Sequence, residues 1–137
     1  MARDVFGNLL EWGNVMNMLG ELGKTNQLDQ HQEGLARILR YKDNWRLRET
    51  VLQCCTGIRR PENVLLDEIR RVMMSVDEYY DLRILAVTAM GALASRAPRA
   101  TTEDALGSLH VLLDAPQPPI LHDAVQKAIA GVASATR

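Results

Sequence analysis

The strongest constraint on this chain is a twelve-residue apolar pattern that recurs along the sequence. Its clearest copy runs from Leu82 to Leu93, with further copies at Leu47–Ile58 and Leu121–Val132 and a weaker one at Glu11–Leu22. Each copy places apolar residues three and four positions apart, which is the spacing of one face of an α-helix. A pattern that returns every roughly 30 to 45 residues is typical of repeat proteins built from stacked helical pairs.

The residues between the copies also follow a helical period, and small residues share one position of the pattern. Cys54, Ala89 and Ala128 occupy that position, where they would let two helix backbones approach closely. No segment alternates strictly between apolar and polar residues, so no strand is expected. The sequence therefore predicts an all-α fold.

Turn signals divide the predicted helices into about three and a half helical hairpins within a single domain, residues 1–137. The chain has 137 residues, of which 47% are hydrophobic, and this is enough to bury one core. The predicted first helix of the N-terminal repeat is no longer than Ala2 to Asn8, so we expect that repeat to be truncated or to act as a cap. The partial repeat spans residues 1–25, and the hairpins span 28–60, 61–97 and 101–136.

Four short segments carry the signals for helix ends. Asn44 is a predicted N-cap, and Pro61 is expected in the first turn of the following helix. Thr101–Asp104 reads as a variant capping box. The proline-rich segment Asp114–Pro119 is predicted to be a loop.

The copy at Leu82–Leu93 resembles the bacterial-type HEAT repeat, whose signature is VR-x-x-AA-x-AL-G-x-L and which also occurs in phycobilisome lyase HEAT-like proteins. The resemblance covers residues 28–135. It implies an α-solenoid, in which antiparallel hairpins stack into a right-handed superhelix with their second helices on the concave side. It says little about function, since such repeats serve many tasks. The last copy departs from the signature because His122 stands where the others have arginine.

Arg48 and Arg83 take the arginine position of the pattern. We expect each to bond to a carbonyl or an acidic side chain in the adjacent turn, with Asp43 and Asp77 as the nearest acidic candidates. The alternative is that they bind an anion on the concave face.

The six aromatic residues all lie in the first 80 positions, and several flank the predicted turns. We predict that Trp45, Arg46, Tyr79 and Tyr80, together with Trp12, form an exposed rim that binds a protein partner. The alternative is that these rings plug the ends of the hairpins as core.

Charge is unevenly distributed although the net charge is only -1. Nine basic and five acidic residues lie between Leu35 and Arg71. One interpretation is an edge formed by Arg59-Arg60 and Arg70-Arg71 that binds nucleic acid or another acidic ligand. A solvated helical face is the favoured interpretation because the acidic residues are interleaved with the basic ones.

No motif for catalysis, metal binding or a cofactor is found. Cys54 and Cys55 are interpreted as two small buried thiols, and the three histidines are scattered along the chain. We therefore expect a non-enzymatic adaptor or scaffold without a cofactor. A less favoured alternative is an accessory subunit of a lyase-type enzyme.

The sequence also bears on location and self-association. No segment has the roughly 20 apolar residues needed to cross a bilayer, so we expect no membrane partner and a cytoplasmic location. Apolar residues near the N-terminus suggest a surface for a homo-oligomer. They are Leu9, Leu10, Val15, Met16 and Leu19.

Overall fold

The computed structural model describes residues 4–135, and this range contains seven α-helices and no strand, which confirms the all-α prediction. None of the helices in this range combines the length and the apolar character needed to cross a membrane. The α-helices are α1 (Trp12–Lys24), α2 (Gln32–Arg40), α3 (Trp45–Cys54), α4 (Asn63–Met74), α5 (Tyr80–Leu93), α6 (Arg99–Asp114) and α7 (Pro119–Ala135). Three short 3-10 helices, η1 (Leu28–His31), η2 (Cys55–Gly57) and η3 (Ala94–Arg96), lie between them.

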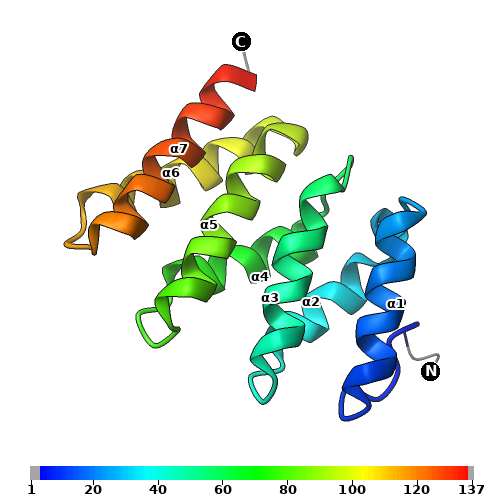
Figure 1. Cartoon of the computed structure of the whole chain (residues 1–137). Coiled ribbons are helices and arrows are strands. Elements are labelled where there is room, and N and C mark those ends of the chain that lie inside the picture. The colour runs from blue at the N-terminus through cyan, green and yellow to red at the C-terminus, as the bar shows by residue number, and fades with distance from the viewer. Residues whose placement is uncertain (1–3, 136–137) are drawn as a thin grey trace.

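The helices form two rows (Figure 1). In the first row, α1 packs on α3, α3 on α5 and α5 on α7, while α2, α4 and α6 form the second row in the same order. Each first-row helix after α1 also packs on the helix that precedes it in sequence. The N-terminal ends of α1, α3, α5 and α7 lie along one edge of the molecule.

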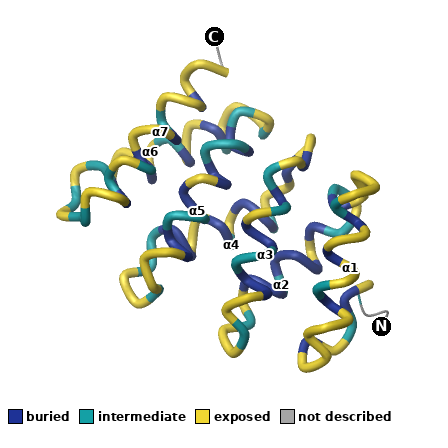
Figure 2. The backbone as a smooth tube through the Cα atoms, in the orientation of Figure 1, coloured by how far each residue is buried: buried dark blue, intermediate teal, exposed yellow. Residues whose placement is uncertain are grey.

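The core lies between the two rows, and the loops at both edges are largely exposed (Figure 2). The recurring apolar pattern supplies this core, because its positions turn toward the second row. In α5 and α7 the same four positions of the pattern are buried. They are Leu82, Ala86, Ala89 and Leu93 in α5, and Leu121, Val125, Ala128 and Val132 in α7.

The N-terminal segment differs from the predicted short helix over Ala2–Asn8. Residues 4–11 form turns instead, and Ala2 lies outside the described residues. Gly7 has a φ of 63°, a left-handed conformation that glycine adopts readily and that ends a helical path.

This segment covers α2, in agreement with the capping alternative. Phe6 is buried against Gly34, where an added Cβ would lie only 2.6 Å from the Phe6 ring. The Arg37 Nε donates to Asp4 Oδ2 at 2.6 Å. That ion pair lowers the pKa of Asp4 and raises the pKa of Arg37. This segment therefore covers the outer side of α2, where no earlier helix of the second row lies within the described residues.

Two of the predicted helix ends are confirmed. Asn44 is the N-cap of α3, and its Oδ1 accepts hydrogen bonds from the backbone N–H groups of Arg46 and Leu47 at 3.1 and 3.3 Å. The predicted loop at Asp114–Pro119 separates α6, which ends at Asp114, from α7, which begins at Pro119.

Two others are wrong. Helix α6 begins at Arg99, so Thr101–Asp104 lies inside the helix and does not form a capping box. The Thr102 hydroxyl instead donates backward to the carbonyl of Ala94 at 2.7 Å, which ties α6 to the preceding turn. Helix α4 begins at Asn63, so Pro61 precedes the helix.

Candidate functional site

The N-terminal ends of three neighbouring first-row helices carry exposed aromatic side chains. Trp12, Trp45 and Tyr80 are the first residues of α1, α3 and α5, and their exposed fractions are 51%, 54% and 51%. Tyr79, just before α5, is 39% exposed. We call Trp12, Trp45, Arg46, Tyr79 and Tyr80 the rim. Its rings lie at the surface, so the alternative that they form core is wrong.

Three side-chain contacts hold the rim residues of α3 and α5. The Arg46 guanidinium lies 5.3 Å from the centre of the Trp45 ring, and that of Arg83 lies 5.9 Å from the centre of the Tyr80 ring. Such cation–π contacts favour one ring orientation. The Tyr79 hydroxyl donates to Glu49 Oε2 at 3.0 Å and so links α5 to α3. Burial and the Glu49 carboxylate raise the pKa of Tyr79, which keeps this donor protonated at neutral pH.

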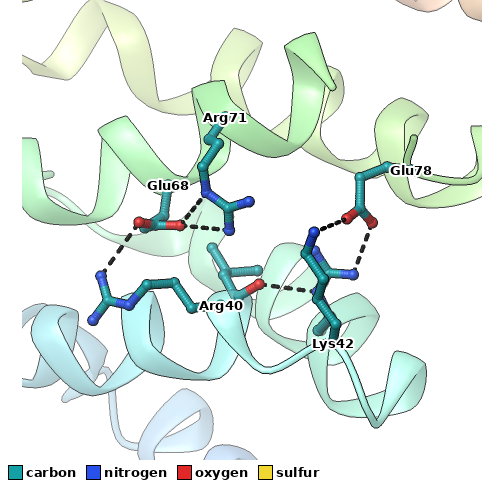
Figure 3. Close-up of polar contacts among 7 residues, drawn as sticks. Arg40, Lys42, Glu68, Arg71 and Glu78 are labelled. Atoms are coloured by element: carbon teal, nitrogen blue, oxygen red, sulfur yellow. Dashed lines mark hydrogen bonds and ion pairs between the residues drawn. The ribbon is translucent and has the colours of Figure 1, made fainter. Parts of the chain in front are cut away.

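A buried ion pair joins Arg48 on α3 to Glu78, the residue before Tyr79 (Figure 3). The Arg48 Nε donates to the carbonyl of Leu39 at 2.9 Å, and its Nη1 donates to Glu78 Oε2 at 2.7 Å. Both side chains are less than a tenth exposed. The predicted carbonyl bond is thus confirmed, but Glu78 replaces the expected acidic partner Asp43. The Arg48 side chain reaches the turn between α4 and α5, which contains Glu78, whereas Asp43 lies in the turn directly before α3.

The acidic group of this pair is held in its charged form. Burial by itself would raise the pKa of Glu78, but the hydrogen bond from Arg48 and the charges of Arg48, Lys42 and Arg71 lower it overall. The Lys42 Nζ lies 3.8 Å from Glu78 Oε1. The Glu78 carboxylate is therefore ionised at neutral pH.

A second charged group joins the same two helix pairs. Glu68 on α4 accepts from Arg40 on α2 at 3.3 Å and from Arg71 Nη2 at 2.8 Å (Figure 3). This places Arg71 in a structural ion pair, so its charge is partly balanced.

Arg83 repeats only half of the Arg48 arrangement. Its Nε donates to the carbonyl of Met73 at 3.2 Å, as the carbonyl prediction required. The expected bond to Asp77 is wrong, and within residues 4–135 Arg83 has no acidic hydrogen-bond partner. Glu78 stands two residues before α5, and the corresponding residue before α7 is Gln117, which is neutral. The contact between the α4–α5 pair and the α6–α7 pair thus lacks the carboxylate that would complete the arrangement seen at Arg48.

The four arginines proposed as a basic edge do not form one patch. Arg59 and Arg60 precede α4, whereas Arg70 and Arg71 lie near its C-terminal end. At 1.5 Å per helical residue, Arg70 lies about 10 Å along α4 from its first residue, Asn63, and Arg59 and Arg60 stand before that residue. The backbone N–H groups of Arg59 and Arg60 both donate to Asp29 Oδ2, which fixes that turn without using the guanidinium groups.

A shallow groove of about 420 Å³ lies between α5 and α7. Ile84 and Thr88 line it from α5, and Ile120, Asp123 and Lys127 line it from α7. Ile120 is 65% exposed at the start of α7. Sequence reasoning missed this residue, although its position directly before the recurring pattern matches that of Arg46 and could have indicated it.

The remaining candidate groups are buried or dispersed. Burial raises the pKa of Cys54 to about 11 and that of Cys55 to about 12, so both thiols stay protonated at neutral pH. Across the described part of the chain, no three histidine, cysteine or acidic side chains gather as metal ligands.

The apolar residues suggested for self-association are divided by the fold. Leu9, Val15 and Leu19 are buried within the chain, and Met16 is half-buried. Leu10 is 74% exposed. Most of the expected surface is therefore already used in the core.

No family model, curated protein or solved structure matches this chain. The candidate site therefore rests on the geometry of the rim and the groove beside it.

Proposed function

We propose that this protein is a HEAT-like α-solenoid that acts as a non-enzymatic adaptor and binds a protein partner at the rim. Three features support the solenoid: the recurring apolar pattern, the two rows of helices and the packing of each pair on the next. In this proposal the rows form a right-handed superhelix whose concave side is the first row. The free thiols of Cys54 and Cys55 favour a cytoplasmic location.

The observation that carries the proposal is the register of the exposed rings. Trp12, Trp45 and Tyr80 each begin a first-row helix, and each is about half exposed. Tryptophan, tyrosine and arginine are the residues that most often dominate the energy of protein interfaces. Part of their ordering cost is already met, because Arg46 and Arg83 lie against two of the rings.

The groove between α5 and α7 extends the same binding surface. Ile84 and Ile120 give it apolar walls, and Asp123 and Lys127 provide one charge of each sign. A partner that follows the rim from α1 to α5 would reach this groove next. The separated arginines provide no comparable surface for nucleic acid, so the adaptor remains the preferred proposal.

The test is partner capture from a lysate of the source cells, quantified by mass spectrometry. Trp45→Ala combined with Tyr80→Ala should lose at least about 90% of the specific partner, since truncating central aromatic residues typically costs about 2 kcal/mol or more. Val76→Ala is the matched control, because Val76 is 83% exposed in the turn before Tyr80 and is not one of the rim residues. Equal capture by the double variant and the wild type, with both folded by circular dichroism, would refute the rim as the binding surface.

A further inference from the structure

We infer that the partner segment at the rim is proline-rich and basic and binds in the polyproline II conformation. This inference rests on the proposed function and specifies the chemistry of its partner. Three properties of the rim support it: the spacing of its rings, the acidic side chains between them and the hydrogen-bond donors on the rings.

The three rim rings stand on neighbouring packed helices, so we take the usual distance between such helices as their spacing. Trp12, Trp45 and Tyr80 begin α1, α3 and α5, and these helices pack in that order. Packed helices lie about 8 to 10 Å apart. A polyproline II helix rises about 3.1 Å per residue with three residues per turn, so every third side chain returns to the same face after about 9.3 Å. One ring can therefore meet one turn of such a segment.

Other conformations match this spacing less well. Residues on one face of an extended strand repeat about every 6.6 to 6.8 Å, and the turns of an α-helix repeat every 5.4 Å. Proline also favours flat aromatic surfaces, and a segment that is already extended has little conformational entropy to lose on binding.

Charge on the rim defines the second property of the partner. Asp43, Asp77 and Asp81 are exposed beside the rim rings, and their carboxylates make no hydrogen bond or ion pair within residues 4–135. Of the nearby exposed cations, Lys42 lies 3.8 Å from Glu78, and Arg46 lies against Trp45 but has no acidic partner within residues 4–135. Carboxylates without an ion pair thus outnumber such cations at this edge, which favours arginine or lysine in the partner segment.

The rings also supply donors that match the partner backbone. A polyproline II segment makes no internal hydrogen bonds, so its carbonyl groups need donors on the surface that binds it. The indole N–H groups of Trp12 and Trp45 and the hydroxyl of Tyr80 have no acceptor in the described part of the chain. Their apolar faces and polar edges together fit a backbone that offers only acceptors.

The chain provides its own probe of this surface. It contains two tryptophans, Trp12 and Trp45, and both belong to the rim, so the intrinsic tryptophan emission reports on the rim directly. A ligand that covers these half-exposed rings should shift the emission to shorter wavelength and protect it from acrylamide quenching.

The experiment titrates the full chain with three synthetic twelve-residue peptides at low salt. The first repeats Pro-Pro-Arg, the second repeats Gly-Ser-Arg with the same charge, and the third repeats Pro-Pro-Ala without charge. We expect saturable binding of the first peptide, with affinity at least tenfold higher than that of either of the others. Equal affinity of the Gly-Ser-Arg peptide would show that charge alone is recognised, and this would overturn the inference.

Variants separate the contributions of ring, donor and charge. Tyr80→Ala should weaken Pro-Pro-Arg binding about tenfold, and Tyr80→Phe should weaken it less because the ring remains. Asp77→Asn with Asp81→Asn should weaken binding and reduce its dependence on salt. Asp104→Asn, an exposed acidic residue on α6 away from the rim, should leave binding unchanged.

Failure of this inference can be distinguished from failure of the adaptor function. Suppose that no peptide alters the emission, while the Trp45→Ala and Tyr80→Ala double variant still loses the partner from lysate. The polyproline II inference would then be wrong, and the rim would remain a binding surface for a partner of other chemistry. If no peptide alters the emission and the double variant still captures the partner, both the inference and the adaptor proposal are refuted.

Discussion

Two interfaces between successive helix pairs occupy corresponding places in this protein, yet they are built from different chemistry. Between α2–α3 and α4–α5, the pairs Arg48–Glu78 and Arg40–Glu68 join the helices through charge. Between α4–α5 and α6–α7, Gly91 lies so close to Ala128 that an added Cβ would be 2.8 Å from the Ala128 Cα. The first interface depends on charge balance, and the second depends on the absence of a side chain.

This difference shows that helix pairs with the same apolar pattern can pack on one another through two kinds of contact. A buried ion pair gives little net stability against an apolar alternative, but the loss of one partner is costly because it leaves an unbalanced charge. A close backbone contact has no such charge to balance, and it fails when volume is added. The predictions below test whether the two interfaces fail in these separate ways.

The largest effect is expected from Glu78→Ala. This change leaves the buried Arg48 guanidinium without its carboxylate and should lower the free energy of unfolding by about 3 to 5 kcal/mol. Urea denaturation at pH 7 measures it. Asp77→Ala is the matched control, because Asp77 is exposed in the same turn and should change stability by less than about 0.5 kcal/mol.

The ionic character of the first interface can be tested further by removing both charges. Arg48→Met combined with Glu78→Met should be clearly more stable than Glu78→Ala alone, since no buried charge remains unpaired. If the double variant is as unstable as the single one, packing rather than charge holds this interface.

A smaller loss is expected from Gly91→Ala at the second interface. The new methyl group would press on Ala128 and should lower the free energy of unfolding by about 1 to 3 kcal/mol. Gly107→Ala on α6 is the control, because an added Cβ there meets nothing within 4 Å. Alanine favours a helix over glycine by roughly 0.5 to 1 kcal/mol, so the two substitutions should act in opposite directions.

Acid should weaken the first interface and leave the second unchanged. The pKa of Glu78 is lower in the folded chain than its ordinary value of about 4.5, so its charged form stabilises the fold above that pH. This contribution should be lost as the pH falls from about 4.5 through the lowered pKa. Urea midpoints of the wild type should therefore fall more steeply below pH 5 than those of Glu78→Gln, and parallel curves would contradict this.

The smallest effect on stability is expected at the rim. Trp45→Ala removes a ring that is 54% exposed, together with its contact to Arg46, so the free energy of unfolding should fall by less than about 1 kcal/mol. Thermal unfolding followed by circular dichroism measures this. A larger loss would mean that Trp45 supports one of the two interfaces.

Helix positions could be predicted from the sequence because the buried residues are apolar and lie three and four positions apart, which is the spacing of one helix face. Leu82 and Leu121 occupy the same position of that pattern, and both are fully buried. The Asn44 cap could also be predicted, since its oxygen bonds to N–H groups only two and three residues away.

Contacts between separate segments were harder to predict. Nothing near Arg48 indicates that its side chain would reach Glu78, 30 positions further along the chain. The Thr102 hydroxyl bonds eight positions back, so its capping signal was misleading. For the candidate site, the sequence suggested which rings gather at the turns, but exposure depended on the packing of helices that it did not specify.

The helices of the first row have different numbers of packing neighbours, so the two ends of the rim differ in how firmly they are held. Helix α5 packs mainly on α3, α4 and α7, whereas α1 packs mainly on α3 and the short η1. Amide hydrogens should therefore exchange fastest in α1 and slowest in α5. Trp12 stands on the helix with fewer packing neighbours and Tyr80 on the helix with more, so local opening should displace Trp12 more often than Tyr80. In the proposed complex, the α5 end of the rim would therefore hold a partner segment more firmly than the α1 end.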